Sequence, residues 1–313
     1  SIVFKDLIRG DVSFDNSELE DWVAVRSNGV PTYNFVCAID DSAMRISHVI
    51  RGEEHLVNTP KQILLCNSLG LDVPEFAHVP LIIGEDGKKL SKRTGETSLA
   101  SYIESGYPSS ALFNFLCLLG FAIDDKTTIF SKDELLDNFS LARVSKSSAI
   151  FDVKKLTWMS GEYIRSQNLD ELLSNLKPFL KELKDALPFV DMSLLVKSLQ
   201  PRASVYSDFL RQAHWLVEWA PREKVLKELK KPEVKEILEG LKKELADCEW
   251  PLEDFFSFAK EFAESQNLGV GKVMKPLRCA LTGELGGPEL LDVLNLLGRE
   301  QSLTRLANAI ALL

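Results

Sequence analysis

Apolar residues follow one spacing in the first third of the chain and another in the remainder. Residues 33–39 and 44–50 are rich in aromatic and β-branched residues and flank the turn-forming residues 40–42. They predict two strands that could pair as a hairpin. Residues 53–69 predict a helix that is interrupted early by Pro60. The buried side of this helix is expected to carry Ile63, Leu64, Leu65 and Leu69.

A short apolar run at residues 79–83 precedes a loop, residues 84–95, with glycine at both ends. This order predicts a strand followed by a basic loop. Farther along, strand signals fade and apolar residues recur every three or four positions, as in amphipathic helices. Examples are Leu172, Leu176, Phe179, Leu183 and Leu187, and later Phe209, Ala213, Leu216 and Ala220. The fold is therefore predicted to be mainly α, with an N-terminal α/β portion.

The bulk composition is that of a globular chain of moderate size. Its 313 residues are 45% hydrophobic, which allows a large core and about two or three domains of ~100–150 residues. The sequence has no apolar run of the ~20 residues that cross a bilayer and no signal-peptide pattern, so we expect neither secretion nor a membrane. The formal net charge of -9 argues against a general nucleic-acid coat but allows local basic patches that read one folded RNA.

The cysteines are widely spaced along the chain. They are Cys37, Cys66, Cys117, Cys248 and Cys279. The sequence contains no C-x-x-C pair and no histidine at zinc-ligand spacing from a cysteine. We expect reduced, mostly packed thiols in a reducing compartment, and the sequence gives no support for zinc or another metal.

The glycine-bounded loop has the clearest chemical character. It holds the basic residues Lys88, Lys89, Lys92 and Arg93 and the hydroxyl residues Ser91 and Thr94. Basic side chains can neutralise charge on a transferring phosphoryl group or a leaving pyrophosphate, and glycine hinges let a loop close. Composition alone favours a solvated basic turn, because charged loops usually have no catalytic role.

The loop sequence Lys89, Leu90, Ser91, Lys92, Arg93 resembles the K-M-S-K-S signature of class I aminoacyl-tRNA synthetases, in the form used by glutamyl enzymes. The match continues in order through residues 31–35, 40–41, 48–55, 58–62 and 76–80 upstream, and 106–108, 111–116, 119–120, 271–283 and 296–298 downstream. Such a collinear series is highly specific. The chain resembles the glutamyl-tRNA synthetase family of bacterial or organellar type over essentially its whole length.

The resemblance implies the second half of a class I Rossmann-type catalytic core, then a stem-contact region and an all-helical anticodon-binding region. The expected domains are 1–30 for the end of an inserted acceptor-binding domain, 31–93 for the catalytic half, 94–168 for the stem-contact domain, and 169–230 and 231–313 for two anticodon-binding subdomains. Cytosolic eukaryotic and glutaminyl enzymes have β-barrels in place of the helices. The helical pattern therefore favours the bacterial type.

In the family, glutamate and ATP form glutamyl-adenylate, and the glutamyl group then passes to the 3′-terminal adenosine of tRNA(Glu). The resemblance implies that Lys92 stabilises the phosphates during adenylate formation, with help from Lys89 and Arg93. The residues expected at the ATP are Lys92, Glu54, Ile82 and Ser91. ATP is expected to bind with Mg²⁺.

Arg51 is implied to pair with the side-chain carboxylate of glutamate, and a planar, always charged guanidinium suits that task. Tyr33 would offer its hydroxyl to the same carboxylate, and Cys37 occupies a position that faces the substrate in many family members. Without the resemblance, Arg51 would be interpreted as a surface ion-pair residue and Tyr33 as a core aromatic residue. Cys37 would be a packed thiol, and Glu54 an exposed residue at a helix start.

A second class I signature, H-x-G-H, is absent from these residues. None of the histidines at positions 48, 55, 78 and 214 has another histidine three residues on. In the family, the residues for the α-amino and α-carboxylate groups also precede the matched region. We therefore expect a chain that lacks its N-terminal part and is inactive by itself, whether through truncation, proteolysis or natural absence.

Arginines near two tryptophans are candidates for reading the anticodon. Arg202 and Arg211, with Arg222, could offer guanidinium contacts to unpaired bases, and Trp215 and Trp219 could offer stacking faces. Alternatively, the two tryptophans lie four residues apart on one helix face and belong to the core, while the arginines are surface charge.

The expected partners are tRNA(Glu), L-glutamate and ATP, with a monomeric state and a cytoplasmic or organellar location. Whether tRNA(Gln) is also charged stays open. A second hypothesis is a noncatalytic tRNA-binding or adaptor module that uses only the helical half. Such a module does not need an intact signature loop, nor Arg51 and Tyr33 in register, so the ligase hypothesis ranks first.

Overall fold

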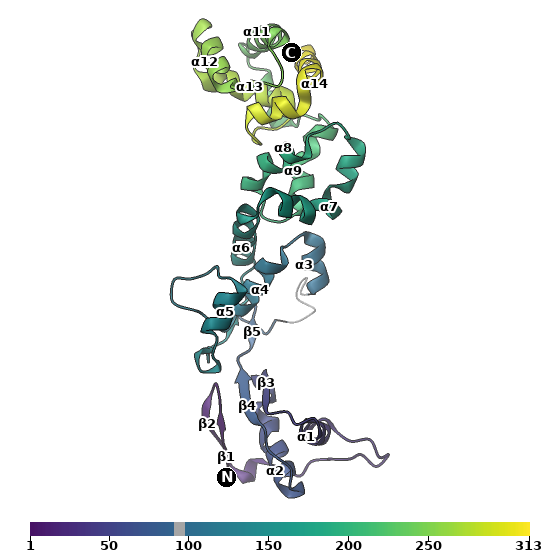
Figure 1. Cartoon of the computed structure of the whole chain (residues 1–313), viewed down its shortest axis with the longest axis vertical. Coiled ribbons are helices and arrows are strands. Elements are labelled where there is room, and N and C mark those ends of the chain that lie inside the picture. Colours follow the sequence, from purple (N-terminus) through teal and green to yellow (C-terminus); the bar gives the residue numbers. More distant parts are fainter. Residues whose placement is uncertain (91–97) are drawn as a thin grey trace. The chain divides into compact units, whose positions relative to one another are not determined.

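The computed structural model describes residues 1–90 and 98–313 (Figure 1). The chain divides into two compact units, one of Ser1–Ser98 with Ser110–Leu156 and the other of Leu99–Ser109 with Thr157–Leu313. The described strands all belong to the first unit, and the second unit is helical. The predicted fold class is confirmed, whereas the proposed domain boundaries stay predictions.

A four-stranded sheet of order β2-β1-β4-β3 lies in the first unit. Its strands are β1 (Ile2–Asp6), β2 (Gly10–Phe14), β3 (His48–Gly52) and β4 (Glu75–Val79). β1 and β2 form an antiparallel hairpin, whereas β4 is parallel to β1 and to β3. The register places Asp6 opposite Phe76 and Arg51 opposite His78, so these four residues lie close together on three adjacent strands.

Helical segments adjoin strand β3 in the sequence. They are α1 (Tyr33–Ala43), η2 (Glu53–Asn58) and α2 (Thr59–Leu69). The predicted β-hairpin over residues 33–50 is wrong, because residues 33–43 form α1 and only the end of that stretch enters β3. Aromatic and β-branched residues favour a strand locally, but α1 packs against α2 and this packing decides the structure.

The helix predicted after β3 is present, and Pro60 lies in the first turn of α2, where its missing N–H costs no hydrogen bond. Its predicted buried side is wrong in part, since Leu64 and Leu69 are exposed. Gln62 donates to the Asn34 side chain of α1 at 3.1 Å, so a different face turns toward α1. The buried residues of α2 are Thr59, Pro60, Gln62 and Cys66.

Two short strands follow in the same unit. β5 (Ile82–Ile83) and β6 (Ala149–Ile150) pair in parallel, and Phe151 N donates to Ile83 O at 2.9 Å. β5 is the strand expected before the basic loop, whereas the sequence pattern did not predict β6. The remaining described elements before residue 150, apart from α3, are η1 (Asn16–Glu18), α4 (Ser109–Leu118), α5 (Lys132–Asn138) and η3 (Leu141–Arg143).

The second unit is built of helices around one hydrophobic core. Its elements are α3 (Leu99–Ser105), α6 (Val153–Ser166, whose first residues belong to the first unit), α7 (Leu169–Ala186), α8 (Met192–Leu199), η4 (Gln200–Arg202), α9 (Ser207–Val217), α10 (Glu223–Leu229), α11 (Val234–Asp247), α12 (Phe255–Ser265), α13 (Val270–Thr282) and α14 (Leu290–Ala311). The apolar periodicity is confirmed on α7, where Leu172, Leu176 and Leu183 are buried, and on α9, although Ala220 lies beyond its end. Among the described helices, none combines the length and the apolar character that crossing a membrane requires.

Candidate functional site

Arg51 is held in a fixed orientation by neighbours on β4 and α2. Its Nε donates to His78 Nε2 at 3.2 Å, and its Nη2 donates to Thr59 Oγ1 at 2.9 Å. The guanidinium carbon lies 5.4 Å from the ring centroid of Phe76, within the range of a cation–π contact. Because a guanidinium has five N–H groups, these contacts fix its plane and still leave donors for an anionic ligand.

Tyr33 of α1 contacts the same guanidinium and also Cys37, which lies one turn farther along the helix. Burial and a hydrogen bond with Cys37 raise the pKa of Tyr33, and the Arg51 charge and hydrogen bond oppose this rise. The Tyr33 side chain remains 49% exposed, and its ring centroid lies 5.4 Å from that of His55. The structure thus brings together the three residues predicted to bind glutamate, whose role stays a prediction.

A chain of amide side chains fixes the start of α1 beside Tyr33. Asn34 Nδ2 donates to Asn58 Oδ1 at 3.3 Å, while its own oxygen accepts the Gln62 amide. Asn58 Nδ2 in turn donates to His55 Nδ1 at 3.3 Å. These contacts join α1, η2 and α2 beside Arg51.

The basic loop begins with a tight hairpin. Gly84 N donates to Lys88 O at 2.8 Å, and Leu90 N donates to Ile82 O at 3.1 Å. Gly87, at the tip, has a φ of 72°, which glycine adopts without the strain of a side chain. The predicted phosphate-binding residues Ser91, Lys92 and Arg93 lie outside the described residues.

Lys89 and Glu54, both predicted to lie near ATP, form an ion pair. Lys89 Nζ lies 3.2 Å from Glu54 Oε1, and both side chains are exposed to solvent. A hydrogen bond from the Glu54 backbone, followed by the one from Lys89, lowers the pKa of Glu54. Ile82, the other described residue predicted at the ATP, is partly exposed on β5. These three residues occupy the described part of the loop base, and their contact with ATP stays a prediction.

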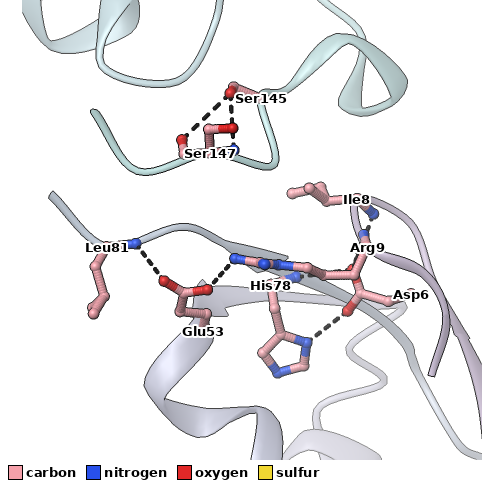
Figure 2. Close-up of polar contacts among 8 residues, drawn as sticks. All are labelled: Asp6, Ile8, Arg9, Glu53, His78, Leu81, Ser145 and Ser147. Atoms are coloured by element: carbon pink, nitrogen blue, oxygen red, sulfur yellow. Dashed lines mark hydrogen bonds and ion pairs between the residues drawn. The ribbon is translucent and has the colours of Figure 1, made fainter. Parts of the chain in front are cut away.

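A buried carboxylate and a buried imidazole stand behind Arg51. His78 Nδ1 donates to Asp6 Oδ2 at 2.6 Å (Figure 2). Asp6 Oδ1 accepts the backbone N–H groups of Ile8, Arg9 and His78 at 3.0, 2.8 and 3.2 Å. Burial alone would raise the pKa of Asp6, but these hydrogen bonds lower it, and burial lowers the pKa of His78. The pair is therefore an ionised carboxylate and a neutral imidazole.

Sequence reasoning did not assign a role to either residue. The available signal was a single histidine inside the apolar run of β4, since a histidine that is buried on a strand must find hydrogen-bond partners.

A second polar contact ties the sheet to the start of the basic loop. Glu53 accepts the backbone N–H of Leu81 at 3.0 Å with one oxygen and pairs with Arg9 through the other (Figure 2). Leu81 lies between β4 and β5, so this carboxylate positions the segment that leads into the signature loop.

The second unit contains a cavity of about 750 Å³ that is rich in arginine. Arg202, Arg211 and Arg222 line it together with Trp215 and His214. The rest of the lining comes from Gln212, Glu218, Ala220, Thr282, Glu284, Gly286, Gly287 and Pro288. The three arginines proposed for the anticodon therefore share one cavity with an aromatic side chain.

The charges of this cavity are only partly compensated. Arg211 pairs with Asp208 while 76% of its side chain remains exposed. Arg278 donates to Pro288 O, and burial, followed by the charge of Arg202, lowers its pKa. The repulsion that Arg202 exerts on Arg278 favours an anionic ligand beside them.

The prediction that Trp215 and Trp219 share one helix face is wrong, because α9 ends at Val217 and Trp219 lies beyond it. Trp215 is buried, as the core interpretation predicted, and it also lines the cavity.

Arg305 of α14 forms the support behind Trp215. Its Nη1 donates to Leu281 O at 2.7 Å and its Nη2 to Leu216 O at 3.1 Å. Its guanidinium carbon lies 5.9 Å from the ring centroid of Trp215, and burial lowers its pKa to about 10. It thereby joins the ends of α9 and α13. Sequence reasoning missed this residue because an arginine in an amphipathic helix normally faces solvent.

Comparison with known families covers nearly the whole chain. Residues 1–158 match the family described as tRNA synthetases class I (E and Q), catalytic domain, and residues 165–310 match an anticodon binding domain. The chain is 40% identical to a glutamate–tRNA ligase of Moorella thermoacetica, over 98% of this chain and 65% of the relative. It is 39% identical to that of Geotalea uraniireducens, over 98% of this chain and 67% of the relative.

Solved structures of glutamate tRNA ligases are also similar to this chain. A glutamate tRNA ligase from Elizabethkingia meningosepticum, crystallised in complex with its amino acid, superposes with a TM-score of 0.88 at 32% identity. The match covers 99% of this chain and 66% of that one. The chain thus spans about two thirds of the length of the relatives it matches.

Proposed function

We propose, since this chain belongs to the glutamate–tRNA ligase family of class I tRNA synthetases, that it takes part in the ATP-dependent attachment of L-glutamate to tRNA(Glu). Its first unit would bind the amino acid and ATP, and its second unit would bind the anticodon. The single observation that carries the proposal is the positioned guanidinium of Arg51 with the hydroxyl of Tyr33 against it.

The guanidinium of Arg51 suits the side-chain carboxylate of glutamate. Its plane is fixed from behind by His78 and Thr59, so its remaining N–H groups form a pre-organised fork for two carboxylate oxygens. Tyr33 keeps its proton at neutral pH, because its pKa is raised from the ordinary value, and its hydroxyl can donate to the same carboxylate. A neutral side-chain amide would gain less from this charge, which favours glutamate over glutamine.

Lys89 and Glu54 support a role of the loop base in ATP binding. Because their ion pair is exposed, it contributes little stability and can open when a polyphosphate competes for the ammonium group. Lys92 and Arg93 would add their charges during adenylate formation.

Mg²⁺ is expected to arrive with the phosphates of ATP, as is usual for this ion. Within the described ranges, no group of three or more His, Cys, Asp or Glu side chains could hold a metal ion.

The arginine-rich cavity supports recognition of the anticodon. Unpaired RNA bases bind by stacking on aromatic rings or guanidinium planes and by hydrogen bonds to their edges. Trp215 lines the cavity, and Arg202, Arg211 and Arg222 offer donors for bases and phosphates.

Glutamate-dependent ATP–pyrophosphate exchange tests the proposal, in the longest natural chain that carries these residues. Arg51→Gln removes a charged partner of the substrate, which typically costs 2–5 kcal/mol, so kcat/KM for glutamate should fall by about 10²-fold or more. The KM for ATP should stay unchanged. Arg26→Gln, at an exposed arginine of the same unit, is the matched control.

An unchanged response to glutamate in Arg51→Gln would sink the proposed role. If every natural chain that contains these residues binds tRNA and none supports exchange, the adaptor hypothesis replaces the ligase.

A further inference from the structure

Arg51 depends on a hydrogen-bond acceptor that the proposed reaction does not itself use. Its Nε–H points at His78 Nε2 at 3.2 Å, and an imidazole nitrogen accepts only when it carries no proton. The orientation of Arg51 therefore requires one particular tautomer of His78. What selects that tautomer lies on the other side of the imidazole, at Asp6 (Figure 2).

We propose that Asp6 and His78 are positioning residues for the glutamate site: Asp6 holds His78 in the tautomer protonated at Nδ1, and His78 Nε2 then fixes Arg51 to meet the substrate's side-chain carboxylate. The inference rests on the proposed function.

Asp6 is an acceptor at both of its oxygens. Oδ1 receives the backbone N–H groups of Ile8, Arg9 and His78, and Oδ2 receives the imidazole. An ionised carboxylate accepts hydrogen bonds only, so the proton between Asp6 and His78 belongs to Nδ1. Both side chains are buried, so water does not compete for this arrangement.

The other states of His78 are incompatible with its neighbours. A proton on Nε2 instead of Nδ1 would oppose the N–H of Arg51 and would leave Asp6 Oδ2 without its donor. A doubly protonated imidazole would place a second positive charge 3.2 Å from the Arg51 nitrogen, where like charges in a buried site repel strongly. The Nδ1–H form is the one that satisfies every contact.

Thr59 completes the support. Its hydroxyl lies 3.2 Å from His78 Nε2 and 2.9 Å from Arg51 Nη2. It can donate to the imidazole and accept from the guanidinium at the same time. Arg51 is therefore held at two points, and the contact from its Nε requires that His78 Nε2 carry no proton.

The parallel sheet makes this relay possible. His78 and Arg51 are direct partners in the β3–β4 register, and Asp6 ends β1 on the other side of β4. The carboxylate, the imidazole and the guanidinium thus come from three adjacent strands, whose spacing of about 4.8 Å lets each side chain reach the next. Rigid elements of this kind are suited to holding a binding group within a fraction of an ångström.

Asp6→Asn tests the inference with almost no change in volume. The asparagine oxygen can keep the backbone N–H groups, and its amide nitrogen then faces His78 Nδ1. The imidazole must move its proton to Nε2, opposite the N–H of Arg51. Selective ¹⁵N-histidine labelling of the purified chain reports the tautomer, since the chain has only four histidines and His78→Gln identifies the signal.

We expect the wild-type His78 to show the Nδ1–H tautomer and Asp6→Asn to show the Nε2–H tautomer. In pyrophosphate exchange, Asp6→Asn should raise the KM for glutamate by at least about tenfold, as expected when a hydrogen bond to a charged group is lost, and leave the KM for ATP unchanged. Asp15→Asn, at an exposed aspartate that accepts a backbone N–H at 2.8 Å, is the control. A merely structural Asp6 would not separate the two KM values.

If Asp6→Asn does not fold, Thr59→Val removes one of the two holding points. It should raise the KM for glutamate by about threefold to tenfold without changing the tautomer. A wild-type His78 protonated at Nε2 would overturn the inference, and so would an unchanged KM for glutamate in both variants. If Arg51→Gln lowers glutamate use but these variants do not, the inference alone fails. If Arg51→Gln also has no effect, the proposed function fails with it.

Discussion

Replacing Arg305 by methionine tests whether one buried guanidinium holds the arginine-rich cavity together. The side chain is only 7% exposed and donates to the backbone carbonyls of Leu281 and Leu216, near the ends of α13 and α9. Methionine keeps much of the volume and removes both hydrogen bonds. The two carbonyl groups then lose a charged donor, and Trp215 loses the cation behind its ring.

The expected cost follows from two opposing terms. Each hydrogen bond from a charged donor contributes ~1.5–3 kcal/mol, so the pair contributes several kcal/mol. Burial of the charge opposes them: it lowers the pKa of Arg305 from its ordinary value to about 10, which corresponds to ~3 kcal/mol. We therefore expect Arg305→Met to destabilise the second unit by about 2 kcal/mol. At ~2–4 °C per kcal/mol for a unit of this size, its Tm should fall by about 4–8 °C.

Calorimetry of the whole chain measures this shift, and hydrogen exchange assigns it. Peptides from α9 and α13 should exchange faster in Arg305→Met, whereas peptides from α1 and α2 should not change. Arg299→Met is the control, since Arg299 is an exposed arginine on the same helix that donates to Ala246 O, and it should cost under ~1 kcal/mol. A Tm for Arg305→Met within about 1 °C of wild type, or an equal loss in the control, would refute the reasoning.

Three further outcomes are expected. Lys92→Ala should slow adenylate formation by at least ~10²-fold in pyrophosphate exchange with little loss of tRNA binding, and an unchanged rate would remove Lys92 from the reaction. Arg202→Ala should weaken binding of the anticodon stem-loop about tenfold in fluorescence anisotropy and lower its salt dependence, unlike the control Arg26→Ala. Chemical unfolding should show the first unit losing stability from about pH 7.5 to about pH 5.5, because the pKa of His78 is lowered in the folded state and the unfolded chain binds its proton first, near pH 6.5. His78→Gln should flatten this profile, and a flat wild-type profile would count against the neutral imidazole.

The spacing of apolar residues predicted the helices well where that spacing alone determined which side chains are buried. Leu172, Leu176 and Leu183 recur at helical intervals, and that pattern is independent of what the helix packs against. Residues 33–39 satisfied a strand pattern equally well on composition. Their helical structure depends on packing between α1 and α2, which neighbouring residues in the sequence do not reveal.

In the candidate site, too, some residues could be predicted from the sequence and others could not. Arg51, Tyr33 and Cys37 were predicted to bind glutamate through the resemblance of their surrounding motifs, and the structure places them together. Asp6 and His78 were not found, because about 70 residues separate them and only the parallel pairing of β1 with β4 joins them. Their contact depends on the order of the strands in the sheet. The spacing of apolar residues along the chain does not predict that order.

The pairing of β5 with β6 has a consequence for how the chain folds. Ile82 meets Ala149 across about 67 residues of intervening chain, and only two residues of each strand take part. Closing a loop of that length costs about 4 kcal/mol of chain entropy beyond a constant. The few hydrogen bonds between β5 and β6 do not offset this cost until the surrounding structure has formed. The base of the basic loop should therefore assemble late, after the four-stranded sheet. Under mechanical pulling or mild denaturant it should be among the first parts to detach, while Arg51 and its partners on the four-stranded sheet stay in place.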